Sequence, residues 1–173
     1  MIDRAPLILT AELPRDLHRW ATELRRRHYP PERNFLDAHV TLFHALPPRI
    51  EEELRCLLAR IVGRSAPPPA RLMGVMSLGQ GTALRLESPA LLELRAAIAE
   101  HFHGMLTAQD NHSPRLHITI QNKVTAREAK TLQSELAGVV SLRPFLVPGV
   151  ALHRYRGGPW EAVRRFAFRA ANR

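Results

Sequence analysis

Two short segments with the same pattern place the strongest constraint on the fold: His39-Val40-Thr41-Leu42 and His117-Ile118-Thr119-Ile120. Polar and apolar side chains alternate in each segment. Because successive side chains of a β-strand point to opposite faces, we expect each segment to be a strand with one buried apolar face. The histidine and the threonine of each segment then share the other face. The fold must therefore supply two strands, each accessible on one side.

Strand-like runs and helical spacing of apolar residues alternate along the rest of the chain. Ser88-Pro89 combines a capping residue with a proline in the first helical turn, and Thr125 and Glu128 form a capping box, so both sites predict helix starts. Helices are also expected after Pro14 and around residues 50–61. This order of elements predicts an α+β fold. Strands are expected at residues 5–13, 38–46, 70–78, 82–87, 115–123, 145–155 and 162–168.

The proline-rich segment 65–69 is a stiff connector between the two patterned strands. It predicts two related lobes within a single domain that spans residues 1–173. Cys56 is the only cysteine, so no intrachain disulfide is possible. The chain lacks a run of about 18 apolar residues, and the start at Met1-Ile2-Asp3-Arg4 lacks a signal-peptide pattern. We therefore expect a cytoplasmic protein without a membrane span.

The chain carries a net charge of +9 and has an isoelectric point of about 11.2. An excess of positive charge attracts polyanions and phosphate-bearing ligands. All of the 25 basic residues except Lys123 and Lys130 are arginines, and a bias toward arginine codons would produce the same excess. The charge is consistent with an anionic substrate but does not identify one.

The paired histidines and threonines suit the chemistry of a phosphodiester. Opening a cyclic phosphodiester requires a base that activates water and an acid that protonates the departing oxygen. Histidine titrates near neutral pH, so one neutral and one charged imidazole can coexist. The hydroxyls of Thr41 and Thr119 can donate to the non-bridging oxygens. Protons and hydrogen bonds complete this chemistry, and the sequence therefore predicts no metal and no cofactor.

Extending the alternation along both strands gives candidate substrate contacts. It places Asp37 and Phe43 on the polar face of the first strand. It places Arg115, Gln121 and Lys123 on the polar face of the second strand. An aromatic ring, an amide and two cations suit a phosphate attached to a base. With two residues of the C-terminal region, the candidates are Phe43, Arg115, Gln121, Tyr155 and Arg156.

Other conspicuous residues favour structural roles. The run Arg25-Arg26-Arg27 ends a helix, where cations interact favourably with the helix dipole. Trp160 follows the turn at residues 157–159, and we expect it to cover the hairpin rather than to stack on a base. His101 and His103 lie two positions apart on an expected helix and point in different directions, so they predict no metal site.

The sequence resembles the two-histidine phosphoesterase superfamily, in particular the bacterial 2′-5′ RNA ligase and cyclic phosphodiesterase group. Both four-residue segments match the family's His-x-Thr-x pattern, in which x is apolar. The order of elements agrees over nearly the whole chain. The ending is also similar, because residues 150–155 and 166–168 look like the family's closing hairpin.

The resemblance implies a bilobal α+β fold with two antiparallel-rich sheets, pseudo-two-fold symmetry, a central cleft and helices on the outside. It implies that His39 and His117 face each other across the cleft and that Thr41 and Thr119 hold the phosphate. The implied substrates are 2′,3′-cyclic phosphates or 2′-5′ linkages of RNA ends or small nucleotides. No obligate protein partner is expected. The roles of the two histidines, and the choice between hydrolysis and ligation, stay open.

Two alternatives remain at this point. The positive charge also suits a basic RNA-binding module whose site is vestigial. The same catalytic groups would equally serve a phosphoesterase that acts on a cyclic phosphate unrelated to RNA, such as a sugar cyclic phosphate.

Overall fold

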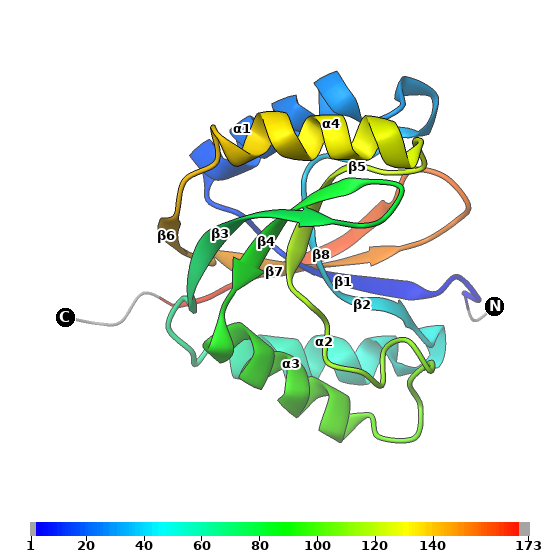
Figure 1. Cartoon of the computed structure of the whole chain (residues 1–173). Coiled ribbons are helices and arrows are strands. Elements are labelled where there is room, and N and C mark those ends of the chain that lie inside the picture. The colour runs from blue at the N-terminus through cyan, green and yellow to red at the C-terminus, as the bar shows by residue number, and fades with distance from the viewer. Residues whose placement is uncertain (1–2, 170–173) are drawn as a thin grey trace.

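Two four-stranded antiparallel sheets form the centre of residues 3–169, the part of the chain that the computed structural model describes (Figure 1). The first sheet has the order β2 (Val40–Leu46), β1 (Leu7–Ala11), β7 (Gly149–Arg154) and β8 (Glu161–Ala167). The second has the order β5 (His117–Gln121), β4 (Thr82–Glu87), β3 (Pro69–Ser77) and β6 (Arg143–Leu146). Each sheet therefore has one patterned strand at its edge, and the predicted α+β class is confirmed.

Four α-helices lie outside the sheets in this part of the chain, α1 and α4 on one side and α2 and α3 on the other (Figure 1). The predicted helix starts are confirmed: the Ser88 hydroxyl accepts from the Leu91 N–H at 3.2 Å, and Thr125 and Glu128 form the capping box. None of these helices is long and apolar enough to cross a membrane. The helices are α1 (Arg15–His28), α2 (Glu51–Val62), α3 (Pro89–His101) and α4 (Ala126–Ala137), with short 3-10 turns at Pro31–Arg33 and Pro48–Ile50.

The segment 145–155 was expected to be a single strand, and this prediction is wrong. The structure has β6 in the second sheet and β7 in the first, separated by Val147 and Pro148. Proline has no N–H for a sheet ladder, and the chain changes sheets at this point. The proline-rich connector therefore leads from the first sheet to the second, but β7 and β8 return to the first. Buried apolar residues from both sheets form one contiguous cluster.

Both patterned strands contain a β-bulge at the same place. In β2 the pairing with β1 shifts by one residue between Thr41 and Phe43, and in β5 the pairing with β4 shifts between Thr119 and Gln121. An extra residue in one strand reverses the alternation of side chains beyond it. The polar face that starts at each histidine therefore ends two residues later, at the threonine.

The free edge of β2 is covered by a carboxylate from the loop that precedes β5. Asp110 is only 1% exposed, and its oxygens accept from the backbone N–H groups of His44 at 2.9 and 3.0 Å and of Ala45 at 2.9 Å. Burial raises the pKa of Asp110, but the hydrogen bonds from His44 and Ala45 outweigh it and hold the pKa below its ordinary value. The carboxylate thus accepts the hydrogen bonds that a neighbouring strand would otherwise accept from this edge of β2.

We expect Asp110→Ala to lower the free energy of unfolding by about 2–4 kcal/mol at pH 7, because buried N–H groups lose their acceptor. The folded-state pKa of Asp110 is lowered, so its contribution is present above about pH 4 and is lost as the pH falls further. Urea denaturation at several pH values measures both effects. Asp16→Ala is the control, because Asp16 is exposed and its carboxylate contacts only Arg143 and the Leu17 N–H among residues 3–169. An equal loss in both variants would contradict this role of Asp110.

Candidate active site

The two histidine rings are held by the same kind of hydrogen bond. The Nδ1 atom of His39 lies 2.8 Å from the carbonyl oxygen of Asp37, and the Nδ1 atom of His117 lies 2.6 Å from that of Arg115. A carbonyl oxygen can only accept, so Nδ1 carries the hydrogen in both rings. Each neutral ring therefore has its lone pair on Nε2. Each histidine can take up a proton at that atom, or release one from it when charged.

The two motif segments converge although they belong to different sheets. The edge strands β2 and β5 contact each other. The Arg25 guanidinium donates from Nε to the Leu36 carbonyl at 3.1 Å and from a terminal nitrogen to the Thr119 carbonyl at 2.8 Å. One side chain therefore touches both the approach to His39 and the strand of His117. The positive charge of His117 is also close enough to lower the pKa of His39.

The threonines of the two motifs keep accessible hydroxyls. Thr41 and Thr119 are partly exposed, and no hydrogen bond within residues 3–169 occupies either side chain. Thr41 lies opposite Thr10 in the pairing of β2 with β1, so these two side chains share a face. Both motif hydroxyls can donate to a bound anion. The intervening apolar residues are buried, as the alternation predicts: Val40, Leu42, Ile118 and Ile120.

The electrostatic surroundings of His39 favour its neutral form. Burial is the largest cause, and the positive charges of Arg25, His153 and His117 add to it. Together they outweigh the hydrogen bond to Asp37 and lower the pKa of His39 to about 4. At neutral pH this ring therefore accepts a proton rather than carrying one.

A cavity of about 410 Å³ lies beside His39. The Trp160 ring forms one wall, with its centroid 4.7 Å from the His39 ring and 5.5 Å from the His153 ring. The Thr10 hydroxyl lies 3.2 Å from Nε2 of His153, and burial lowers the pKa of His153. Trp160 therefore faces the candidate site, whereas the sequence favoured a covering role. The lining residues are Thr10, Ala11, Glu12, Leu13, His18, Leu36, Asp37, Ala38, His39, Ala151, His153, Trp160 and Ala162.

Phe43 and Gln121 do not reach this site, and both were predicted to contact the substrate. Phe43 is 0% exposed and packs under the guanidinium of Arg95, 4.2 Å from the ring centroid. Gln121 is 6% exposed and its side-chain oxygen accepts from the Thr82 hydroxyl at 3.1 Å. The two bulges explain both errors, because each turns the residue after it into the interior.

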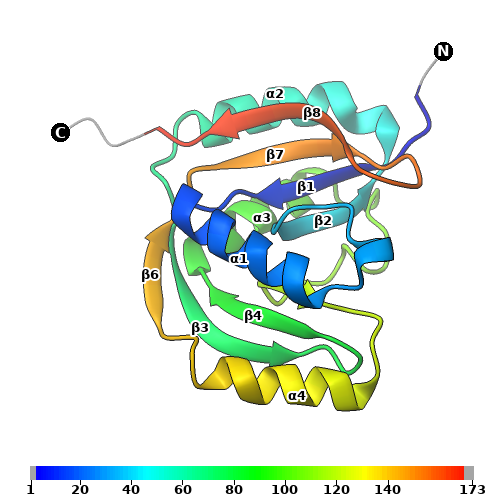
Figure 2. The ribbon, with the colours of Figure 1, turned by 90° about the horizontal axis from the view of Figure 1, so that it is seen from above.

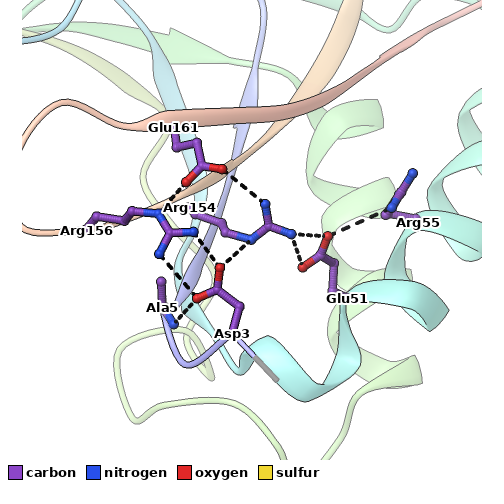
Figure 3. A network of polar contacts seen from close by, with 7 residues as sticks. All are labelled: Asp3, Ala5, Glu51, Arg55, Arg154, Arg156 and Glu161. Carbon is purple, nitrogen blue, oxygen red and sulfur yellow. Dashed lines mark hydrogen bonds and ion pairs between the residues drawn. The ribbon is translucent and has the colours of Figure 1, made fainter. Parts of the chain in front are cut away.

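Arg156 is held in a network of ion pairs (Figure 3). It pairs with Asp3 and Glu161, and the neighbouring Arg154 binds Glu51 at 2.5 Å. The network connects β7 with the start of α2 and with the N-terminal segment. Arg156 does not line the cavity beside His39. The structure therefore gives Arg156 ion-pair partners within the protein, and its contact with substrate stays a prediction.

Two further candidates for substrate contact, Tyr155 and Arg115, have exposed side chains. Tyr155 is exposed, its backbone N–H donates to Pro6, and it does not line the cavity. Arg115 is exposed, but its backbone carbonyl holds the His117 ring. Arg25, Arg26 and Arg27 lie in the last turn of α1, as predicted, although Arg25 is buried rather than solvated. Its neighbour Arg26 is exposed, as expected for a solvated helix end.

Other histidines contact single carboxylates. His101 lies 2.7 Å from Glu53, and His44 lies 3.2 Å from Asp110. Among the residues that the structure describes, no three side chains of histidine, cysteine, aspartate or glutamate gather as metal ligands.

Comparisons with known proteins identify a family for this chain and solved structures with the same fold. A family model described as the 2′-5′ RNA ligase superfamily matches residues 13–159. No curated protein sequence matches the chain. The solved structure of TT0787 from Thermus thermophilus is 20% identical, with a TM-score of 0.64 over 96% of this chain and 100% of that chain. E. coli LigT complexed with 3′-AMP is 19% identical, with a TM-score of 0.62 over 96% and 99%. At these identities the structures establish a common fold.

We expect the imidazole of His39 to titrate with a pKa of about 4 in an NMR titration of the wild-type protein. Trp160→Ala should raise this pKa toward 6.5, because water would reach the ring and stabilise its charged form. Tyr155→Ala, in the same loop but on the exposed side, is the control and should leave the titration unchanged. A His39 pKa that does not move in Trp160→Ala would contradict burial by the indole ring.

Proposed function

This chain belongs to the 2′-5′ RNA ligase superfamily, and we propose that it is a metal-independent phosphodiesterase acting on 2′,3′-cyclic phosphates or 2′-5′ linkages of RNA ends or small nucleotides. The observation that carries the proposal is the equivalent fixation of His39 and His117. Both rings are held through Nδ1, both present Nε2, and their segments meet at Arg25. Two such imidazoles supply the base and the acid that phosphodiester hydrolysis requires.

We assign the base to His39 for the hydrolytic direction, because its lowered pKa keeps it neutral at pH 7. Its Nε2 atom takes a proton from water as the water oxygen bonds to phosphorus. The bond from phosphorus to the ribose oxygen breaks, and protonated His117 gives its Nε2 proton to that oxygen. The hydroxyls of Thr41 and Thr119 donate to the non-bridging oxygens, where negative charge accumulates.

The cavity supports a nucleoside on the His39 side of the phosphate. Its walls combine the Trp160 ring with alanine and leucine side chains and a few polar groups. Such a mixture suits an aromatic base with hydrogen-bonding edges. The complex of E. coli LigT with 3′-AMP, a protein of the same fold, supports a ligand of this class.

Turnover of 2′,3′-cyclic nucleotides tests the proposal. We expect His39→Ala and His117→Ala to lower kcat by about 10²–10⁴-fold each, and Thr41→Ala or Thr119→Ala by about 10²-fold, because proton transfer and charge stabilisation are lost. Wild-type activity should persist in a chelator. His101→Ala is the control, since His101 contacts Glu53 outside the site. Activity that survives both single histidine substitutions would refute this mechanism.

The same experiment separates the alternatives. A basic RNA-binding module would bind RNA with a steep salt dependence, without turnover and without regard to the histidines. A panel of cyclic phosphates that includes sugar cyclic phosphates, with analysis of the products, identifies the substrate and the bond that breaks. Turnover confined to sugar cyclic phosphates would overturn the assignment to nucleotides while leaving the two-histidine mechanism intact.

A further inference from the structure

Two buried arginines lie next to the motif strands but have no role in the proposed chemistry. Arg25 of α1 is 3% exposed and Arg95 of α3 is 4% exposed. Burying a guanidinium is unfavourable unless its donors find partners, and burial lowers the pKa of both groups. Neither forms an ion pair with a carboxylate within residues 3–169. Their N–H groups donate instead to oxygens of the backbone and of one amide.

Arg25 holds β5, the strand that carries His117, by a hydrogen bond. Besides the bonds to Leu36 and Thr119, it donates to the Asn34 side-chain oxygen at 3.1 Å. Its guanidinium stacks on Tyr29, 4.4 Å from the ring centroid. Helix α1 connects two strands of the first sheet, yet this arginine holds β5 of the second.

Arg95 holds β2, the strand that directly follows His39. Its Nε atom donates to the Leu42 carbonyl at 3.2 Å, and a terminal nitrogen donates to the Asp110 carbonyl. The guanidinium stacks on Phe43, the residue that the bulge turns inward. Helix α3 connects two strands of the second sheet, so this arginine holds β2 of the first.

The two contacts are therefore reciprocal. Each half of the molecule contributes one helix whose arginine reaches the other half, and in the second view α1 lies over the junction of the two sheets (Figure 2). Each helix places a guanidinium on a carbonyl of the other half's edge strand. Because an edge strand lacks a neighbour on that side, these bonds fix its position relative to the opposite half.

We propose that Arg25 and Arg95 are positioning residues that set the separation of His39 and His117, an inference that rests on the proposed function. Neither residue takes part in the proton transfers. Displacing catalytic groups by about 1 Å can lower a rate about 10²-fold, so strands held loosely would impair turnover more than binding. Arg25 has a second effect, because its charge opposes protonation of His39.

The kinetic test uses Arg25→Met, Arg95→Met and the lysine variant of each. In both methionine variants we expect kcat on a 2′,3′-cyclic nucleotide to fall about 10–100-fold with KM nearly unchanged. Lysine keeps the charge but cannot bridge several acceptors, so the lysine variants should also lose kcat. Arg26→Met is the matched control, because Arg26 is exposed on the same helix, and it should retain wild-type kcat. Folded methionine variants with the kcat of the control would overturn the proposal.

Two measurements that require no turnover test the positioning role independently of the proposed function. They are an NMR titration of His39 and hydrogen exchange of the β5 amides. Arg25→Met should raise the His39 pKa, because a nearby positive charge is removed, and Arg25→Lys should leave it near the wild-type value. Hydrogen exchange of the β5 amides should quicken in both variants. If the wild type shows no turnover but the amides respond as described, the function fails and the positioning role stands. If the wild type turns over but the amides and kcat are unchanged in the variants, the positioning role fails.

Discussion

A strand at the edge of a sheet leaves one row of backbone N–H and C=O groups without a strand partner. Both motif strands of this protein are edge strands; β5 begins at His117, and β2 begins directly after His39. Side chains from distant segments take the place of the missing neighbour: Asp110 and Arg95 on β2, and Arg25 on β5. The edges are thereby held in place while one face of each strand stays open to a ligand.

Much of this architecture could be predicted from local sequence, because caps and alternation depend on neighbouring residues. The helix starts at Ser88 and Thr125 belong to this class. The bulges do not, since they depend on pairing with another strand, and for this reason Phe43 and Gln121 were placed on the wrong face. The burial of Arg25 likewise depends on a carbonyl 94 positions away. Thr10 could have been found only from its register with Thr41, which requires the order of the strands.

The two halves have equivalent backbones but unequal surroundings. Each histidine bonds to the carbonyl two residues before it, and each threonine is followed by a bulge. The equivalent positions after the bulges, however, carry Phe43 in one half and Gln121 in the other. Of the two motif histidines, only His39 lines the cavity with Trp160 and His153. A pseudo-symmetric frame thus gives His39 surroundings that the equivalent backbone geometry does not predict, and these surroundings lower its pKa.

The return of β7 and β8 to the first sheet has a consequence for folding during synthesis. Thr10 of β1 bonds to Ala151 of β7, 141 positions later, so the middle of that sheet closes only after β7 has been synthesised. Pairings between such remote segments slow folding, because a long loop must be ordered first. His153 and Trp160 also arrive with these last strands. Until β7 and β8 have been synthesised, His39 therefore lies on an incomplete surface, because residues of both strands line the pocket beside it.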